Sequence, residues 1–372
     1  MVGDTIRCPW HHFDLRTGEA LRAPAFDPLS CWVVELRSDR IFVRSKSSQP
    51  KVLKIGKSVS DTPARIVIVG GGAAGLAAAE TLRRTKFAGS IVMLSNDASA
   101  PVERSGLSKD YLAGNASEDG VPLRPGSFYS ENAIDLQLAT EVVRLDLSSR
   151  EIALSDGQTI RYDRLLLETG AEPVRLWIPG GDRAHVHSLR SLADCRAIIA
   201  RAQTARRAII LGASFIGLEV AAALRSPGIE VYVVAPEKRP LERILGREMG
   251  QFVQSLHEEH GVIFHLNDTA LSIRGNQMTL KGGGILEGDF VVAGIGARPR
   301  VDLAVKAGIA VDRGTVVNSR LETSAKGVFA GDIARWPDPD SGGSIRVEHW
   351  IVPERQGQTA AHDSNATDAR WQ

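Results

Sequence analysis

Two stretches of the chain share one order of apolar, glycine and helix-forming residues. Residues 65–69 read RIVIV and are followed by GGGAAG and LAAAETLRR, while residues 206–211 read RRAIIL and are followed by GASFIG and LEVAAALRS. A short continuous apolar run is typical of a buried strand, and a run rich in alanine and leucine favours a helix. Each stretch therefore predicts a strand, a tight glycine turn and a helix, in that order.

The remaining apolar runs predict further strands and helices. Residues 136–167 contain LQLATEVVRLDL, REIALSDGQTI and RYDRLLL, in which alternating apolar residues and an Asp-Gly pair indicate an antiparallel meander. Residues 246–260 favour a helix, and GVFA at 327–330 favours a strand. The most membrane-like run, residues 208–224, is interrupted by polar residues and is shorter than the ~20 residues of a membrane span, so we expect a buried strand and helix there.

The glycines of the first turn have the spacing that a dinucleotide-binding turn needs. Gly70, Gly72 and Gly75 follow the pattern G-x-G-x-x-G. The first permits the turn, the second lets a pyrophosphate approach the backbone, and the third lets the helix pack against the strand. The helix N-terminus then offers N–H groups and a positive dipole end to phosphate oxygens. A glycine turn can be only a turn, but the flanking strand and helix favour nucleotide binding.

The second turn repeats this pattern with Gly212, Ser214 and Gly217, so that a small serine stands at the middle position. Two such units in one chain predict two bound dinucleotides, which is more specific than either motif alone. The combination points to a flavin that meets a nicotinamide. The predicted fold class is therefore α/β, with two Rossmann-like dinucleotide-binding domains for FAD and NAD.

An acidic residue after the second strand of each unit is the expected ribose ligand, about 20 residues past the last glycine. Asp97 is the candidate in the first unit, with a solvated turn aspartate as the alternative. Glu237 is the candidate in the second unit, and it suggests NAD because a carboxylate repels a 2′-phosphate. Lys238 and Arg239 adjoin Glu237 and leave NADP open.

Three further polar residues lie at predicted loops. Arg104 and Lys109 stand in APVERSGLSKDYLAG, a loop that leads into a predicted helix, and the plain alternative is two solvated charges. Asp332 follows the strand-like GVFA and Gly331. It could cap a helix N-terminus or bond a sugar hydroxyl, and these two roles are compatible.

Residues 1–45 predict a small β unit with two candidate metal ligands. Cys8 and His11 are spaced C-x-x-H, FDLRTGEA follows, and CWVVEL and RIFVRS indicate a hairpin. This pattern resembles the second ligand loop of a Rieske domain, whose cluster takes two cysteines and two histidines. Because only half of that ligand set is found, a 2Fe-2S cluster is doubtful, and a zinc site with His12 lacks an evident fourth ligand.

Composition and charge narrow the class of protein. The 372 residues allow two or three domains, and 45 Lys and Arg against 44 Asp and Glu argue against non-specific nucleic-acid binding. Three cysteines without a C-x-x-C pair exclude a disulfide framework and a dithiol relay. A reducing cytoplasm fits this cysteine content, and the residues after Met1 lack a signal-peptide layout.

Seven motifs together resemble the FAD-dependent pyridine-nucleotide oxidoreductase family. The resemblance is to its NADH-dependent ferredoxin and rubredoxin reductases, oxygenase reductase components and apoptosis-inducing-factor-like proteins, including those with a Rieske domain. It covers about residues 62–361, and the motifs agree in order and spacing. They are GGGAAG at 70–75, RSGLSK at 104–109, ETGAEP at 168–173, GASFIGLE at 212–219, GIGARPR at 294–300, GVFAGDIA at 327–334 and EHWIVPERQGQTAA at 348–361.

The resemblance implies a role for each matching residue. Lys109 would sit near flavin N5 and pair with Glu219 beside the nicotinamide, which makes these two the catalytic candidates. The residues implied in FAD binding are Gly70, Gly72, Ala73, Ala74, Gly75, Asp97, Arg104, Lys109, Val142, Thr169, Gly170, Gly331, Asp332, Glu348, His349 and Trp350. Those implied in NAD binding are Gly212, Ser214, Phe215, Ile216, Gly217, Glu237 and Gly296.

The resemblance also implies a division of the chain. We expect a partial Rieske-like unit at 1–45, a polar linker at 46–61, FAD-binding segments at 62–179 and 298–361, an NAD-binding domain at 180–297 and a polar tail at 362–372. The family continues into a C-terminal interface domain, which we expect to be missing here.

Two departures from the family pattern concern the flavin site. Ser105 and Gly106 replace two prolines of the loop before Lys109, so that loop is expected to be less rigid. Glu168 stands where the family has alanine, and a carboxylate there would disfavour an anionic reduced flavin.

The implied activity is hydride transfer from NAD(P)H to FAD, followed by single-electron transfer to a ferredoxin- or Rieske-type iron–sulfur protein. No nucleic-acid or membrane partner is expected, and the oligomeric state stays open. The alternative is a truncated, weakly active or inactive apoptosis-inducing-factor-like protein that binds nucleotides or senses redox state. A disulfide reductase is disfavoured by the absent cysteine pair.

Overall fold

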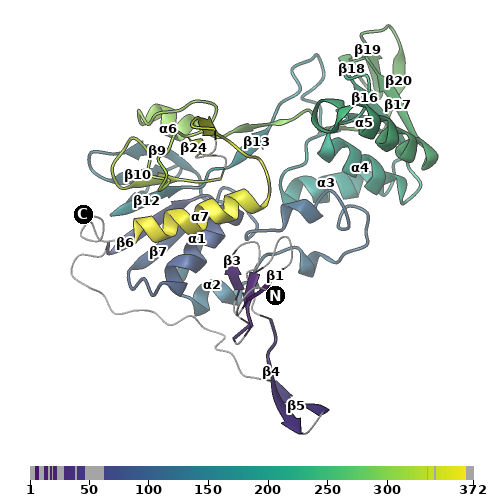
Figure 1. The fold of residues 1–372 in the computed structure, drawn as a ribbon. Coiled ribbons are helices and arrows are strands. Elements are labelled where there is room, and N and C mark those ends of the chain that lie inside the picture. Colours follow the sequence, from purple (N-terminus) through teal and green to yellow (C-terminus); the bar gives the residue numbers. More distant parts are fainter. Residues whose placement is uncertain are drawn as a thin grey trace. The chain divides into compact units, whose positions relative to one another are not determined.

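The computed structural model describes residues 5–7, 12–15, 17–18, 20–22, 29–37, 40–46, 63–332, 334–338 and 341–365. The chain divides into two compact units (Figure 1). Unit 1 comprises Met1–Pro101, Arg124–Gly170 and Pro299–Gln372, and unit 2 comprises Val102–Leu123 and Ala171–Arg298. Each unit has a parallel sheet with helices, so the predicted α/β class with two Rossmann-like cores is confirmed.

The sheet of unit 1 has five parallel strands in the order β23-β12-β6-β7-β8. Its strands are β23 (Val328–Ala330), β12 (Arg164–Leu167), β6 (Arg65–Val69), β7 (Ser90–Leu94) and β8 (Ile134–Gln137). The apolar residues of β6, β7 and β12 are buried, as their continuous apolar runs predict. Helix α1 (Ala73–Arg84) follows β6 directly.

The sheet of unit 2 repeats this arrangement with five strands in the order β14-β21-β15-β16-β17. Its strands are β14 (Val186–His187), β21 (Phe290–Ala293), β15 (Arg207–Leu211), β16 (Glu230–Ala235) and β17 (Val262–Leu266). Helices α3 (Leu192–Ala202), α4 (Phe215–Arg225) and α5 (Glu242–Glu259) complete the core of this unit. Helix α5 begins before the predicted Gly246, which has non-helical φ/ψ and kinks it.

Each unit also has a three-stranded antiparallel sheet. In unit 1 this sheet consists of β9 (Val142–Asp146), β10 (Glu151–Leu154) and β11 (Thr159–Arg161), and in unit 2 of β18 (Ala270–Arg274), β19 (Gln277–Leu280) and β20 (Ile285–Glu287). The meander predicted over 136–167 is therefore only partly correct. Its outer strands, β8 and β12, leave the hairpins and join the parallel sheet.

The remaining elements include two strand pairs and three α-helices. The pairs are β13 (Ala171–Pro173) with β22 (Ala297–Pro299) and β24 (Trp336–Pro337) with β25 (Ser344–Ile345), and the helices are α2 (Ser127–Glu131), α6 (Asp302–Lys306) and α7 (Ile351–Ser364). Helix α7 lies along α1 in unit 1 (Figure 1). A Cβ built on Gly357 of α7 would be only 2.1 Å from the carbonyl oxygen of Ala74 in α1, so this close packing needs glycine.

The segment Val102–Leu123 packs in unit 2, although the sequence division places it inside 62–179. Its side chains Leu107 and Tyr111 belong to the same buried cluster as Cys195 of α3. The Cys195 thiol donates to the Leu107 carbonyl over 3.1 Å. The helix predicted after Lys109 is wrong, because residues 107–114 form turns after a 3-10 turn at Arg104–Gly106.

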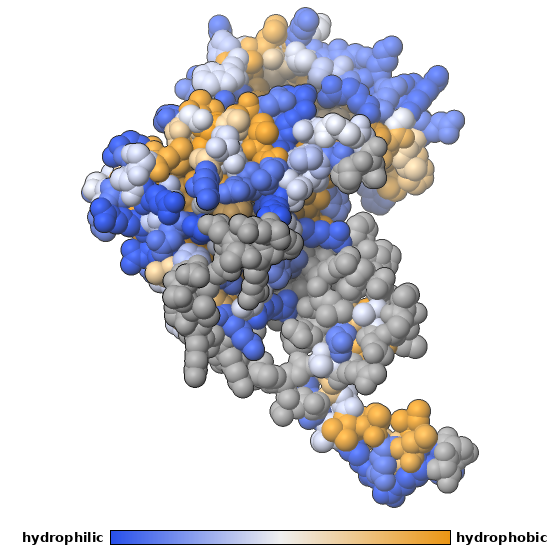
Figure 2. Space-filling model, turned by 60° about the vertical axis from the view of Figure 1, so that its left-hand side comes forward, coloured by the Kyte–Doolittle hydropathy of each residue, from blue (hydrophilic) through white to orange (hydrophobic). Residues whose placement is uncertain are grey.

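The described N-terminal residues form short strands with turns and irregular segments between them. The strands are β1 (Thr5–Arg7), β2 (His12–Asp14) and β3 (Ala20–Arg22) in one antiparallel sheet and β4 (Trp32–Arg37) and β5 (Arg40–Lys46) in a hairpin, which confirms the predicted pair. Figure 2 shows apolar residues on the surface of this hairpin, and Leu36 and Ile41 are more than 70% exposed. Residues 47–61 of the predicted linker lie outside the described residues.

Among the described residues, no helix is long and apolar enough to cross a membrane. The membrane-like run at 208–224 forms strand β15 and helix α4, as predicted.

Candidate functional site: two glycine turns and an ion pair

The first glycine turn in unit 1 depends on glycines at two positions. Gly70 has a φ of +137°, and a Cβ built on it would be 1.9 Å from the carbonyl oxygen of Glu168. A Cβ built on Gly75 would be 2.1 Å from the carbonyl oxygen of Gly70. The Gly70 N–H donates to the Leu94 carbonyl over 2.9 Å. The turn therefore lies against the ends of β7 and β12, where a side chain would not fit.

The second turn in unit 2 has the same dimensions. Gly212 has a φ of +104°, and its N–H donates to the Val234 carbonyl over 2.9 Å. A Cβ built on Gly217 would be 2.1 Å from the Gly212 carbonyl oxygen, as in the first turn. The two units thus carry geometrically matched turns at the carboxyl ends of their parallel strands, which is where open α/β sheets bind ligands.

The helix that follows each turn begins without a side-chain cap. Gly72 precedes α1 and Ser214 precedes α4, and neither provides a capping hydrogen bond. Ser214, Phe215 and Ile216 are exposed at the start of α4. N–H groups, a hydroxyl and apolar side chains at one helix N-terminus fit the phosphates and rings of a dinucleotide.

The ribose candidate of unit 1 lies beside the predicted adenine contact. The Asp97 N–H donates to Ser95 Oγ over 3.2 Å, and its carbonyl accepts the Ala139 N–H over 3.0 Å. The Thr140 N–H donates to the Ser95 carbonyl over 2.7 Å, which brings the start of β9 with Val142 to the same strand end. The structure therefore places Asp97 and Val142 together at the end of β7.

The ribose candidate of unit 2, Glu237, follows β16. Its carboxylate is 3.6 Å from the exposed Arg243 guanidinium and its side chain is 29% exposed, so it is accessible. Arg239 donates to Gln251 and to Glu242, so its charge is occupied within the unit. Lys238 is exposed.

Gly296 lies at the end of the segment after β21 and also requires glycine. It has a φ of +115°, and its carbonyl accepts the Val174 N–H over 2.9 Å. An added Cβ would meet only Val174 at 3.9 Å, so open space lies in front of this backbone. A ligand can therefore approach it closely.

Lys109 and Glu219 meet within unit 2. Although they are far apart in the sequence, their side chains form an ion pair of 3.1 Å between Lys109 Nζ and Glu219 Oε1. Lys109 Nζ also donates to the Ser105 carbonyl over 2.9 Å, and Ser108 Oγ donates to Glu219 Oε2 over 2.5 Å. The Lys109 ammonium is thus held by two groups, Glu219 and the Ser105 carbonyl, and its side chain is 48% exposed, so it is still open to a ligand.

Ser108 is a site residue that the sequence interpretation missed. It is 1% exposed and orients the carboxylate that holds Lys109. Its position directly before Lys109 in the loop is the sequence signal that could have identified it. The loop itself is anchored by Tyr111, whose hydroxyl donates to Glu118 over 2.6 Å, and by Arg196 of α3, which pairs with Glu118.

The loop before Lys109 is ordered by local contacts. The Glu103 carboxylate accepts the Ser105 N–H over 3.3 Å and also the Ser105 hydroxyl. These contacts hold Arg104 in the 3-10 turn Arg104–Gly106. They order the loop where the family pattern has two prolines.

Thr169 and Gly170 follow β12 and are fixed by the backbone of Arg300. Thr169 Oγ1 donates to the Arg300 carbonyl over 2.7 Å, and the Arg300 N–H donates to the Gly170 carbonyl over 2.8 Å. Gly170 has a φ of +64°. Thr169 and Gly170 are therefore held in place by these hydrogen bonds, which suits residues that line a cofactor.

Glu168 and Asp332 lie together at the ends of β12 and β23. Both are buried, and burial together with the negative charge of Asp332 raises the pKa of Glu168 well above its ordinary value. Burial thus favours the neutral form of Glu168. The negative charge that the sequence led us to expect at this position is therefore disfavoured. Residues 334–338 contain no helix, so the N-cap alternative for Asp332 is wrong.

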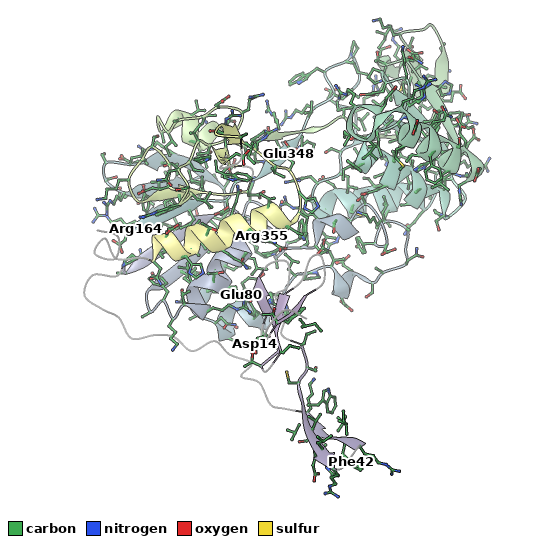
Figure 3. The ribbon with its side chains drawn as sticks, in the orientation of Figure 1. Asp14, Phe42, Glu80, Arg164, Glu348 and Arg355 are labelled. Atoms are coloured by element: carbon green, nitrogen blue, oxygen red, sulfur yellow. The ribbon has the colours of Figure 1, made fainter. Side chains whose placement is uncertain are left out.

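Glu348, His349 and Trp350 precede helix α7 in unit 1. Glu348 is partly exposed near the start of that helix (Figure 3) and pairs with Arg346 over 2.5 Å. His349 Nδ1 accepts the Ile351 N–H over 3.4 Å, and Trp350 is the residue before the first helical position.

The candidate metal ligands Cys8 and His11 lie outside the described residues. Elsewhere, in the parts of the chain that are described, no group of three or more His, Cys, Asp and Glu side chains could hold a metal ion.

Comparison with known proteins accounts for this pair of matched turns. The family described as pyridine nucleotide-disulphide oxidoreductase matches residues 64–357. The chain belongs to this family. The resemblance drawn from the seven motifs is thereby confirmed, and the cofactors of such a two-turn fold, FAD and NAD(H), agree with the glycine cradles described above.

Three similar proteins illustrate the relationship. Rhodocoxin reductase of Rhodococcus erythropolis is 36% identical over 76% of this chain and 68% of its own length. Apoptosis-inducing factor 3 of Mus musculus is 31% identical over 98% of this chain and 63% of its own length. A chain in the crystal structure of the covalent putidaredoxin reductase–putidaredoxin complex is 31% identical with a TM-score of 0.77, covering 80% of this chain and 74% of its own. The chain thus spans about two thirds of the first two relatives.

Proposed function

We propose that this chain is an FAD-dependent NAD(P)H oxidoreductase that passes single electrons to an iron–sulfur acceptor protein. The observation that carries the proposal is the matched pair of glycine turns, one at the strand ends of each parallel sheet. When bound, FAD supplies the conversion of a two-electron hydride into single electrons. The chain supplies binding, orientation and charge, and no acid–base pair is required.

Unit 1 would bind FAD. Gly70, Gly72 and Gly75 with the N-terminus of α1, including Ala73 and Ala74, would hold the diphosphate. Asp97 and the backbone of Val142 would contact the adenosine end, because the structure brings them to one strand end. The remaining proposed contacts from unit 1 are Thr169, Gly170, Gly331, Asp332, Glu348, His349 and Trp350, and Arg104 and Lys109 of unit 2 are also proposed contacts.

Unit 2 would bind the nicotinamide dinucleotide. The turn Gly212–Gly217 and the uncapped Ser214 would receive the diphosphate, with Phe215, Ile216 and Gly296 beside it. Glu237 would accept a ribose hydroxyl, which favours NADH over NADPH because a carboxylate repels a 2′-phosphate.

Lys109 and Glu219 are the proposed catalytic residues. An ammonium held by Glu219 and the Ser105 carbonyl offers a fixed positive charge to a reduced flavin, which is anionic at its pyrimidine edge. This positive charge stabilises the anionic reduced flavin, and because it is already held in place the site needs no reorganisation. It therefore favours reduction of the flavin.

An iron–sulfur protein is the proposed acceptor because of what the relatives are called. They include the ferredoxin–NAD(+) reductase component of an anthranilate 1,2-dioxygenase system in Burkholderia cepacia, 36% identical over 79% of this chain. Cys31 and Cys195 form no disulfide in the described part of the chain, which supports a reducing cytoplasm as the proposed location. We propose no nucleic-acid or membrane partner.

We further propose the domain division 1–45, 46–61, 62–179, 180–297, 298–361 and 362–372, with residues 1–45 as a partial Rieske-like unit. Apoptosis-inducing factor 3 aligns with 98% of this chain and rhodocoxin reductase with 76%, so the N-terminal segment has a counterpart in the former. Cys8 and His11 alone would not hold a cluster. An iron assay of the purified protein tests this, and two irons per chain would contradict it.

The activity is tested with NADH, the FAD-loaded protein and a purified [2Fe-2S] ferredoxin. We expect NADH-dependent bleaching of the ferredoxin absorbance, with ferricyanide as a second one-electron acceptor. NADH oxidation that proceeds with ferricyanide but never with an iron–sulfur protein would contradict the proposed acceptor class.

A further inference from the structure

Glu168 in unit 1 and Gly294 in unit 2 occupy the same place in the two repeated sheets. Glu168 follows β12, and Gly294 follows β21, the strand with the same place in its sheet. The Glu168 N–H donates to the last carbonyl of β6 over 2.9 Å, and the Gly294 N–H donates to the last carbonyl of β15 over 2.8 Å. A Cβ on Gly70 would be 1.9 Å from the Glu168 oxygen, and one on Gly212 would be 2.3 Å from the Gly294 oxygen.

The side chains at this position differ between the two units. In unit 2 the position has no side chain, and an added Cβ on Gly294 would be 3.1 Å from the Gly217 nitrogen at the start of α4. In unit 1 the Glu168 side chain stands next to the glycine turn, and its Cβ is 3.2 Å from a Cβ built on Gly70. The Glu168 side chain therefore begins beside the glycine turn that would hold a diphosphate in unit 1.

The far end of the Glu168 side chain reaches the next strand of the sheet. A Cβ built on Gly331 would be 2.4 Å from Glu168 Oε2, so the carboxyl group lies directly against the Gly331 backbone. Gly331 precedes Asp332, the proposed ligand of the ribityl chain. The carboxyl group thus lies between the diphosphate turn and the ribityl candidate.

The Glu168 carboxyl group has no hydrogen-bond partner among the described residues. Glu168 is 2% exposed, and neither carboxyl oxygen has a hydrogen-bond partner among the described residues. A buried polar group without a partner is costly, and native structures provide one. The raised pKa favours the neutral form, which can donate one O–H and accept at the other oxygen.

We propose that Glu168 is a cofactor-binding residue that hydrogen-bonds, as a neutral carboxyl group, to the ribityl–diphosphate part of FAD. The inference rests on the proposed function. A neutral donor suits this part of the cofactor, because its oxygens accept hydrogen bonds and a second negative charge beside Asp332 would repel the diphosphate. FAD in turn would supply the hydrogen-bond partner that the described residues do not provide.

The test compares Glu168→Gln with Glu168→Leu, two neutral replacements of similar volume that differ in hydrogen bonding. FAD is removed from the wild type and from each variant, and the dissociation constant of added FAD is measured by quenching of flavin fluorescence. We expect Glu168→Gln to bind within about threefold of the wild type and Glu168→Leu to bind about 10-fold more weakly, the effect of one hydrogen bond. Circular dichroism verifies that each variant is folded.

Two results separate this inference from the proposed function. If Glu168→Leu binds FAD as tightly as the wild type while the wild type does bind it, Glu168 is no FAD ligand and only this inference falls. If the folded wild type binds no FAD, the proposed function falls and this inference falls with it. NADH affinity, measured in the same variants, should stay unchanged because Glu168 belongs to unit 1.

Discussion

Lys109 Nζ lies 3.1 Å from Glu219 Oε1, and Ser108 holds the other oxygen of the same carboxylate. The three side chains come from a loop at 102–123 and from helix α4, which pack in one unit. The loop that carries the cation is thereby fixed to the helix that follows the second glycine turn. This arrangement places a fixed positive charge on the helix that we propose to bind the nicotinamide dinucleotide.

Removal of the Lys109 charge should affect flavin reduction more than stability. Because the pair is partly exposed, we expect Lys109→Met to change the free energy of unfolding by about 1 kcal/mol or less. The rate of flavin reduction by NADH should fall roughly 10- to 100-fold, since a preorganised charge is lost. Stopped-flow absorbance measures the rate. Lys281→Met, at an exposed lysine of unit 2, is the control, and equal rates in both variants would refute the role of Lys109.

Gly217→Ala should disrupt the second turn alone. The new Cβ would lie 2.1 Å from the Gly212 carbonyl oxygen, so the helix must shift, at a cost of about 1–3 kcal/mol. We expect NADH affinity to fall at least 10-fold while FAD affinity is kept. Isothermal titration of each cofactor measures this. Gly284→Ala, whose Cβ would meet only Leu280 at 3.7 Å, should bind both cofactors normally, and normal NADH binding by Gly217→Ala would contradict the account.

The anchor of the 102–123 loop should weaken in acid. Hydrogen bonds from Arg196 and then Tyr111 lower the pKa of Glu118 to about 2, below its ordinary 4.5. Because the folded-state pKa is the lower one, its stabilising contribution is complete above pH 4.5 and is lost as the pH falls towards 2. The melting temperature of Glu118→Gln should therefore lie below that of the wild type at pH 6, and the two should converge by pH 2. A constant difference across this range would count against the anchor.

The buried pair Glu80–Arg124 in unit 1 should matter more than an exposed one. Its side chains are 6% and 7% exposed and lie 3.2 Å apart, with Glu80 on α1 (Figure 3). Glu80→Gln removes the carboxylate charge that faces the buried Arg124 guanidinium and the Arg84 guanidinium, so we expect a loss of about 3–5 kcal/mol in the free energy of unfolding. Glu151→Gln, in the exposed pair with Arg161, should cost about 1 kcal/mol or less. Urea unfolding measures both, and similar losses would disprove the distinction.

The local elements of the site could be predicted from the sequence. The apolar run 66–69, its glycines and the helix after them are encoded by neighbouring residues, and the structure has β6 and α1 at those places. The repeat at 206–226 was found for the same reason. Glu237 and Asp97 stay predictions, made from their positions after the second strand of each unit.

The misjudged features depend on partners far away in the sequence. Strand β12 follows β11 directly but pairs with β6 and β23, so local alternation suggested a meander. The packing of Leu107 against Cys195 joins residues that no local pattern connects. The burial of Glu168 likewise depends on Gly331 of a later segment, so its raised pKa is not visible in ETGAEP.

The central claim is that one chain binds FAD and a nicotinamide dinucleotide for electron transfer between them. It is tested most directly by mixing the FAD-loaded protein with NADH in the absence of oxygen and following the flavin absorbance near its visible maximum. The account predicts that the absorbance bleaches with one equivalent of NADH per FAD. Retention of the full absorbance with excess NADH, in protein shown to contain FAD, would contradict it.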